Sequence, residues 1–280
     1  ASFQRSGTAD LAADGLAFTD NHLRFGLLSK TAALLSSAAS PLRWRPDVLH
    51  CNDWPCGMAP AYLHFMDGAK AATVMSIHNL AFQGIFPADT LIPLGLPPEA
   101  YAMDGVEYWG KLSFMKAGLH YADRITTVSP RYAEEIQTEA FGYGFAGLLR
   151  WRRQDLVGIL NGIDMGVWDP ATDPHLPRRY EYAHLKGKEA SKTALRSRFG
   201  LLEEGSSPLL GAVCRITHQK GLDLLLEIGD EIALLPAQLA LLGTGDKSLE
   251  AALLGLAQRH PGRFSVWTGF DDGLAHLVEA

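Results

Sequence analysis

Cysteine and long apolar runs are both scarce in this 280-residue sequence. The three cysteines, Cys51, Cys56 and Cys214, are odd in number, and their spacing fits neither a disulfide framework nor a zinc site. Such usage is typical of a reducing compartment, so a cytoplasmic protein is expected. No uncharged apolar run reaches the ~18 residues of a membrane-spanning helix, so a membrane protein of that kind is excluded.

Positive charge is also in short supply. The 25 Lys and Arg residues against 31 Asp and Glu residues give a net charge of −6, and the longest basic cluster is the RWRR stretch at residues 150–153. We expect this cluster to be a solvated surface turn, and no basic stripe is present to neutralise nucleic-acid phosphates. The sequence also has neither an Asp-x-Asp motif for a metal-bridged diphosphate nor a Walker A loop.

The remaining composition is that of a globular α/β protein. Apolar residues make up 47% and charged residues 20%, and the length suggests about two domains. Short strands alternate with helices, which is typical of parallel β-α-β units and predicts doubly wound sheets. Strands are expected at residues 47–50, 71–77, 124–128, 155–160, 209–214, 238–243 and 264–270. Helices are expected at residues 21–38, 57–65, 106–121, 187–199, 220–232 and 248–259, with a further helix capped by Ser129 and Pro130.

The alternation breaks between residues 161 and 207, where prolines precede a charged helix. This predicts a first domain at residues 1–160 and a second at residues 161–280, with a linker at 161–207. Residues 86–99 are expected to be irregular. In the helix at residues 21–38, capped by Thr19, Asp20 or Asn21, leucines are expected to form the buried face. These leucines are Leu23, Leu27, Leu28, Leu34 and Leu35.

Polar residues follow several of the expected strands, where ligands bind in open α/β sheets. The HCNDWPCG stretch places Asp53 and Trp54 directly after a strand. A carboxylate beside an aromatic ring is a common sugar-binding pair, because the carboxylate accepts hydroxyl hydrogen bonds and the ring covers an apolar sugar face. The residues also allow Asp53 to cap the next helix and Trp54 to pack in the core.

The HNLAFQG stretch follows the next strand and presents His78, Asn79 and Gln83. A single histidine is most often a structural hydrogen-bonding group, but its position at a strand end beside an amide favours a functional role. Asn161 and Gly162 also follow a strand, and their default interpretation is a simple turn.

Two further motifs indicate an anion site. Arg215 ends a strand and Lys220 opens a helix, whose N–H groups and dipole add to the two charges. A pair of surface cations is the alternative. The LLGTGD stretch has Gly243 and Gly245, which let a ligand approach the backbone, although a Gly-x-Gly pair alone is a weak signal.

Six motifs together resemble the bacterial glycogen synthase and plant starch synthase family, glycosyltransferase family 5. They are HCNDWPCGMAPAYL, TVMSIHNLAFQGIFP, GKLSFMKAGLHYADRITTVSP, ILNGIDMGVWDPATD, CRITHQKGLDLLLE and LALLGTGD. The resemblance implies a glycosyltransferase fold of the B type, in which two doubly wound Rossmann-like domains face a cleft. It also implies retaining, metal-independent transfer of glucose from ADP-glucose to the non-reducing end of an α-1,4-glucan, which elongates glycogen without a further cofactor.

The resemblance also assigns roles in the first domain. It implies that His78 lies by the donor glucose, where its ring and backbone carbonyl would stabilise the developing positive charge. Asn79 would brace the same loop, and Gln83 belongs to the same set of substrate-binding residues. Asp53 and Trp54 match positions near the transferred glucose and the acceptor.

On the nucleotide side, the resemblance implies that Arg215 and Lys220 hold the diphosphate and offset the charge of the leaving group. Phe270 matches a position where the family often has a tyrosine against the base, so the stacking is kept and the hydroxyl is lost. Gly243 and Gly245 belong to this nucleotide-binding set, and Asn161 matches a residue that reaches the sugar.

The sequence departs from the family pattern in four places. Phe82 stands where tyrosine is frequent, and His218 lies at a variable position. The Lys-x-Gly-Gly loop and the Glu-x7-Glu motif of the family are both missing, so the sequence is expected to be a fragment in which both domains are incomplete. These 280 residues alone are therefore expected not to transfer glucose.

Three rival interpretations stay open on the sequence. One is a non-catalytic, glucan-binding or regulatory relative, and one is a Rossmann oxidoreductase, for which the third glycine is missing. The third is a retaining transferase of the same fold with another donor or acceptor, such as a sucrose-phosphate synthase or a glycan phosphorylase. The choice between ADP-glucose and UDP-glucose rests on the resemblance, and the sequence does not fix the oligomeric state.

Overall fold

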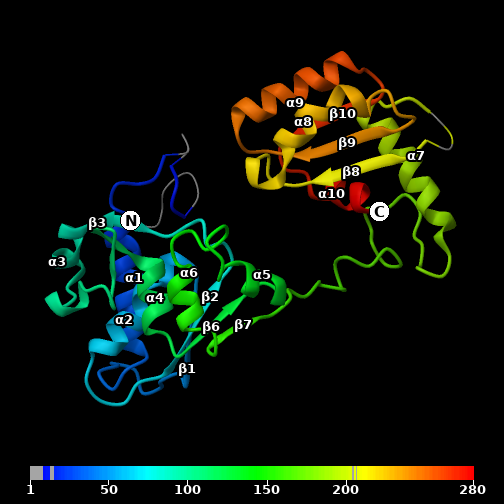
Figure 1. The fold of residues 1–280 in the computed structure, drawn as a ribbon. Helices are drawn as coiled ribbons and strands as arrows, with labels where there is room; N and C mark the ends of the chain where they lie inside the picture. Colours follow the sequence, from blue (N-terminus) through cyan, green and yellow to red (C-terminus); the bar gives the residue numbers. More distant parts are fainter. Residues whose placement is uncertain (1–8, 13–15, 204, 206) are drawn as a thin grey trace. The chain divides into compact units, whose positions relative to one another are not determined.

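The computed structural model describes residues 9–12, 16–203, 205 and 207–280. The chain divides into two compact units, Ala1–Gly162 and Ile163–Ala280 (Figure 1).

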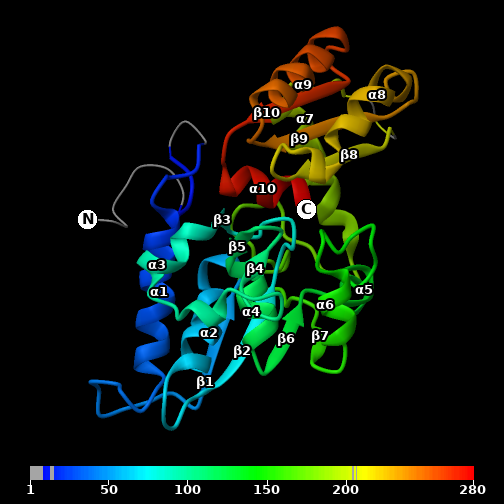
Figure 2. The same ribbon diagram turned by 60° about the vertical axis from the view of Figure 1, so that its left-hand side comes forward.

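Unit 1 is built on a four-stranded sheet with the order β1-β2-β6-β7. The strands are β1 (Val48–Asn52), β2 (Ala72–Ile77), β6 (Arg124–Thr127) and β7 (Leu156–Gly158), and Figure 2 shows them side by side in this order. All neighbours are parallel, which confirms the α/β class expected from the sequence. Asn52 pairs with Ser76, and Ile77 pairs with Thr127, so the first three strands end at a common edge.

The helices of unit 1 are α1 (Asn21–Leu35), α2 (Met58–Phe65), α3 (Leu91–Leu94), α4 (Phe114–Tyr121), α5 (Pro130–Glu135) and α6 (Ala146–Trp151). Apolar residues of α1, α2, α4 and α6 share one core cluster with residues of the sheet. Met75 and Ile77 of β2 are fully buried in one core cluster together with Met58 of α2 and Met115 of α4. The expected cap of α5 is confirmed, since Ser129 accepts a hydrogen bond from the Tyr132 amide.

The single helix expected at residues 106–121 is wrong. The chain first forms a hairpin of β4 (Glu107–Tyr108) and β5 (Lys111–Ser113), and only then enters α4. Trp109 and Gly110 both have positive φ, 51° and 75°, which is the backbone of a tight hairpin turn. β5 also pairs antiparallel with β3 (Ile85–Pro87), so the stretch expected to be irregular begins with a short strand.

The buried face expected for α1 is also wrong. Four of the five leucines are exposed, with fractions from 36% to 59% at Leu23, Leu27, Leu28 and Leu34, and Leu35 is half-buried. Phe25, Ser29 and Ala33 are buried instead, at a spacing of four residues that forms one stripe along the helix. Gly26 explains this choice, because a Cβ there would lie 2.2 Å from Leu94 Cδ2. The helix packs closely through small residues, and larger leucines do not fit that face.

Unit 2 has a three-stranded parallel sheet with the order β10-β9-β8. Its strands are β8 (Leu209–Val213), β9 (Gln238–Gly243) and β10 (Phe264–Thr268), and its helices are α7 (Lys188–Phe199), α8 (Leu222–Ile232), α9 (Lys247–Arg259) and α10 (Asp272–Glu279). All six residues of the central β9 are buried.

Alternate residues of β9 face opposite helical layers, as the two-residue period of a strand requires. Ala240 and Leu242 pack with residues of α7 and α10, whereas Leu241 packs with residues of α8 and α9. Figure 1 shows α8 and α9 on one face of the sheet and α10 on the other. The segment expected to be a linker thus contributes α7 to the core of unit 2, through Leu195 and Phe199.

Candidate functional site

Asp53 follows β1 directly and adopts a backbone conformation that is unusual for a side-chain-bearing residue, with φ 54° and ψ −176°. Its Oδ1 accepts hydrogen bonds from the His78 amide at 2.8 Å and from the Asn79 amide at 3.4 Å. Asp53 makes no side-chain capping bond to the turn that follows it. The carboxylate therefore holds the loop after β2, and the strained backbone aims it there.

His78 is exposed at the end of β2, and its Nε2 lies 3.0 Å from Asn52 Oδ1. Because an amide oxygen only accepts hydrogen bonds, this contact requires a proton on Nε2. Asn79 Oδ1 accepts the Ala81 amide at 3.1 Å, which closes a local turn. Asn52 was missed by the sequence reasoning, although it stands beside Asp53 at the same strand end.

Gln83 fixes the far end of the same loop. Its side-chain Nε2 donates to the Tyr143 carbonyl at 2.7 Å, and its main-chain carbonyl accepts the Ser113 hydroxyl at 2.9 Å. Tyr132 contributes a third tie, because its hydroxyl accepts the Leu80 amide at 3.1 Å. Burial raises the pKa of Tyr132, so its hydroxyl stays neutral in the physiological range.

Trp54 is a core residue with an exposed fraction of 8%. Its indole meets Phe25 edge-on at 4.8 Å between ring centroids, and Phe114 at 6.1 Å. A Cβ on Gly84 would lie 2.3 Å from the indole, so the glycine of HNLAFQG rests on this ring. Trp54 therefore packs in the core, which is one of the two roles that the sequence allowed. The indole also lines a cavity of about 360 Å³ together with Gln83 and Phe86.

Asn161 is exposed three residues beyond the end of β7, in a stretch without regular secondary structure. Among the hydrogen bonds of the described residues, none joins its side chain to the loops after β1 and β2. The structure therefore joins Asp53 to His78 and Asn79 through hydrogen bonds, fixes Gln83 separately at the far end of the same loop, and leaves Asn161 apart from that network.

In unit 2, the two glycines of LLGTGD allow the chain after β8 to run close beside them. A Cβ on Gly243 would lie 2.0 Å from the Cys214 carbonyl oxygen, and a Cβ on Gly245 would lie 2.1 Å from that of Ile216. The Ile216 amide bonds to the Thr244 carbonyl at 3.0 Å, so this close approach extends the parallel pairing. Contact within the chain already requires both glycines, before any ligand is considered.

Glu250 of α9 holds the same loop, although no motif of the sequence marks it. Its Oε1 accepts the Gly245 amide and the Thr244 hydroxyl, both at 2.8 Å, and its Oε2 accepts Lys247 Nζ at 2.7 Å. The hydrogen bonds from the Lys247 ammonium and the Gly245 amide lower the pKa of the Glu250 carboxyl. The carboxylate is 7% exposed, so these bonds satisfy a buried charge.

Arg215 and Phe270 line one cavity of about 230 Å³ together with Gly243, at the carboxyl ends of β8, β9 and β10. Phe270 is 89% exposed, so its ring presents a free face beside this cavity. Lys220 is exposed just before α8, and it does not line the cavity, nor does Gly245. The positive charge of Lys220 nevertheless counteracts the burial that raises the pKa of Cys214, which places the ammonium near that strand end.

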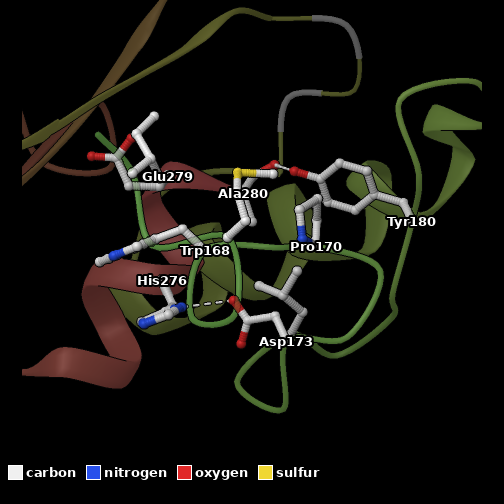
Figure 3. Close-up of a pocket in the computed structure, with 10 residues that line it drawn as sticks. Trp168, Pro170, Asp173, Tyr180, His276, Glu279 and Ala280 are labelled. Carbon is white, nitrogen blue, oxygen red and sulfur yellow. Dashed lines mark hydrogen bonds and ion pairs between the residues drawn. The ribbon is translucent and has the colours of Figure 1, made fainter. Parts of the chain in front are cut away.

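A larger hollow of about 440 Å³ lies elsewhere in unit 2 (Figure 3). It is lined by Trp168, Pro170, Asp173, Tyr180 and His276, together with other residues that include Glu279. None of the candidate site residues predicted from the sequence lines it, although part of its lining comes from the ILNGIDMGVWDPATD motif. The described part of the chain also contains no helix that is long and apolar enough to cross a membrane.

Comparison with protein families matches residues 3–151 to the model of the starch synthase catalytic domain. The chain belongs to this family. The starch synthase resemblance inferred from the six motifs is therefore confirmed.

Curated relatives of this starch synthase family member carry the name glycogen synthase. The protein of Nitrosomonas europaea is 53% identical over 99% of this chain, and that of Aromatoleum aromaticum is 54% identical over 99%. In both cases the chain spans 56% of the relative's length.

A solved structure of the starch synthase family has the same fold. The catalytic domain of starch synthase IV from Arabidopsis thaliana, bound to ADP and acarbose, aligns with a TM-score of 0.81 at 29% identity. The alignment covers 94% of this chain and 55% of the plant chain. The expected glycosyltransferase fold, with parallel α/β sheets, is therefore confirmed.

Proposed function

We propose that the protein is a glycogen synthase. It transfers glucose from ADP-glucose to the non-reducing end of an α-1,4-glucan, with retention at the anomeric carbon and without a metal ion or further cofactor. The observation that carries this proposal is the 53% identity with the glycogen synthase of Nitrosomonas europaea across 99% of the chain. The ADP bound to the Arabidopsis thaliana relative supports an adenine nucleotide as the donor.

In this proposal, the cavity at the strand ends of unit 2 takes the nucleotide. The exposed ring of Phe270 stacks on the base, and the Arg215 guanidinium beside Gly243 pairs with the diphosphate. Lys220 and the N-terminus of α8 add positive potential at the same sheet edge. These two cations offset the charge of the leaving nucleotide, a task that a divalent metal performs at other sites.

His78 acts on the glucose itself. Positive charge develops at the anomeric carbon as the bond to the nucleotide breaks, and the His78 carbonyl and ring nitrogen stabilise that charge. Asp53 positions this group, because its carboxylate holds the amides of residues 78 and 79. Asn79 and Gln83 fix the two ends of the loop, and Trp54 supports it from the core. We assign Asn161 a contact with the sugar on the family resemblance.

Glucose incorporation tests the proposal. The protein from the whole reading frame that encodes this chain is offered glycogen with radiolabelled ADP-glucose or UDP-glucose. We expect incorporation from ADP-glucose and its collapse in His78→Ala, by about 100-fold or more, as for the loss of one transition-state contact of this kind. His184→Ala is the matched control, because His184 is exposed on a loop of unit 2 and should keep full activity.

Each alternative has its own outcome. Incorporation from UDP-glucose alone would indicate a transferase of the same fold with another donor. Absence of incorporation from either donor, in a folded protein that still binds glycogen, would indicate a non-catalytic glucan-binding relative. We also propose a cytoplasmic location, which the three free cysteines support.

A further inference from the structure

Two histidines and one aspartate converge in unit 2, and none of the three is assigned a role in glucose transfer. They are His175, Asp272 and His276, and their potential ligand atoms all lie within 4.8 Å of one another. Asp272 and His276 are four residues apart on α10, so their side chains share one face of the helix. His175 comes from the loop that precedes α7 and meets His276 at 4.7 Å between ring centroids.

The His276 ring is held in one orientation. Its Nδ1 lies 2.7 Å from Asp173 Oδ2, and both side chains are almost fully buried (Figure 3). Because a carboxylate accepts, Nδ1 carries the proton of this hydrogen bond, and Nε2 is the ring atom left for a ligand. Trp168 stacks on the ring at 4.0 Å with an interplanar angle of 6°, which fixes its plane. A carboxylate on one ring nitrogen and a ligand on the other is the arrangement of metal-binding histidines.

Asp173 also positions the second histidine. Its Oδ1 accepts the His175 amide at 2.8 Å, so one buried carboxylate orients both ligand-bearing segments. Gly273 leaves room for the His175 ring, because a Cβ there would lie 3.1 Å from His175 Nδ1. His175 and Asp272 are both exposed, so their side chains can rotate toward a shared ion.

We propose that His175, Asp272 and His276 bind a divalent transition-metal ion of the zinc class. Two imidazoles and one carboxylate are a donor set that suits Zn²⁺, with a fourth position left for water. Ligand atoms around a tetrahedral zinc lie about 3.3 Å apart, so the two exposed side chains need to move inward only slightly. The bound ion ties the loop that holds Asp173 to α10, and it has no part in glucose transfer.

Metal titration of the tag-free, chelator-treated chain tests the site. We expect one Zn²⁺ per chain in competition with a chromophoric chelator, and Co²⁺ in its place should show the visible absorption of a tetrahedral ion. His175→Ala and Asp272→Ala should each weaken Zn²⁺ binding by at least about 100-fold, since even outer partners contribute 10–100-fold. Millimolar Mg²⁺ should not compete, because it prefers oxygen ligands.

Two further variants distinguish a specific zinc site from non-specific binding of Zn²⁺ to exposed histidines. His184→Ala removes another exposed histidine of unit 2 and should leave Zn²⁺ affinity unchanged. Asp173→Asn keeps the shape of the side chain but removes the charge that faces His276. This change should lower the affinity for Zn²⁺ by about 10–100-fold. Equal Zn²⁺ affinity in the wild type, His175→Ala and Asp272→Ala, or no stoichiometric binding to the wild type, would overturn the proposal. These readouts do not depend on glucose transfer.

Discussion

The strand-end loops of the two units are held by opposite means. In unit 1, one side chain at a strained backbone position, Asp53, reaches across to hold the HNLAFQG loop. In unit 2, the absence of side chains at Gly243 and Gly245 lets the chain after β8 run directly beside the LLGTGD loop. Loops at corresponding sheet edges are thus held in place by different kinds of residue. The first depends on a charged acceptor and the second on close backbone contact.

The largest loss of stability is expected when a methyl group is placed where the two backbone segments of unit 2 touch. In Gly243→Ala, the new Cβ meets a carbonyl oxygen at 2.0 Å, and a backbone atom cannot rotate away. We expect a loss of about 3 kcal/mol in the free energy of unfolding, measured by urea denaturation with circular dichroism. Gly255→Ala on α9 is the control, because nothing lies within 4 Å there and alanine favours the helix. Equal stability of the two variants would contradict the role given to backbone contact.

A smaller effect is expected from removing the carboxylate of unit 1. Asp53→Ala loses the acceptor for the amides of residues 78 and 79 and keeps an unfavourable positive φ. The expected cost in the free energy of unfolding is about 2 kcal/mol, typical of hydrogen bonds to a charged group. Asp53→Asn keeps an acceptor and tolerates positive φ, so it should stay closer to the wild type. An Asn variant as unstable as the Ala variant would show that the hydrogen bonds are not what stabilises the loop.

The smallest loss of stability is expected from a carboxylate in unit 2. Glu250 holds the LLGTGD loop there, in addition to the backbone contact of the two glycines. Glu250→Gln should cost about 1.5 kcal/mol at pH 7, since its buried hydrogen bonds lose their charge. The pKa of Glu250 is lowered in the folded state, so its contribution is complete above the unfolded value of about 4.3. It is lost as the pH falls through the lower folded value.

The stability difference between Glu250→Gln and the wild type should therefore shrink as the pH falls below about 4.3, as followed by urea denaturation at each pH. Glu227→Gln is the control, because Glu227 is exposed on α8 and should show no such difference. A difference that is constant with pH would exclude the charged form of Glu250 as the cause.

The sequence predicted the parallel strands and the polar strand ends well, because both signals are local. Strand β2 and the residues after it are an example, since an apolar run and the next few side chains suffice. The face of α1 could not be predicted, because it depends on contact between Gly26 and Leu94, far apart in the chain. The prediction of one helix at residues 106–121 was wrong because β5 pairs with β3, and this pairing overrides the helical pattern.

Among the candidate site residues, the motifs mark Asp53 and His78 but not the residues that hold the strand-end loops. Asn52 and Glu250 are defined by hydrogen bonds to loops, and neither spacing nor composition marks them. The Asp173–His276 pair joins residues 103 positions apart, which no local pattern reveals. The role of Trp54 could not be decided from its neighbours in the sequence. An aromatic residue beside a carboxylate can either stack on a sugar or pack in the core, and Trp54 is buried.

The complete burial of β9 has a consequence for slow motions of unit 2. Amide hydrogens exchange with solvent last in the segments whose opening requires global unfolding, and a central strand covered on both faces belongs to that class. The LLGTGD loop begins inside this strand, so its first residues should share the slowest deuterium uptake of unit 2. The proposed nucleotide cavity is then anchored to the last part of the unit to open, while the exposed Phe270 remains free to adjust to a bound base.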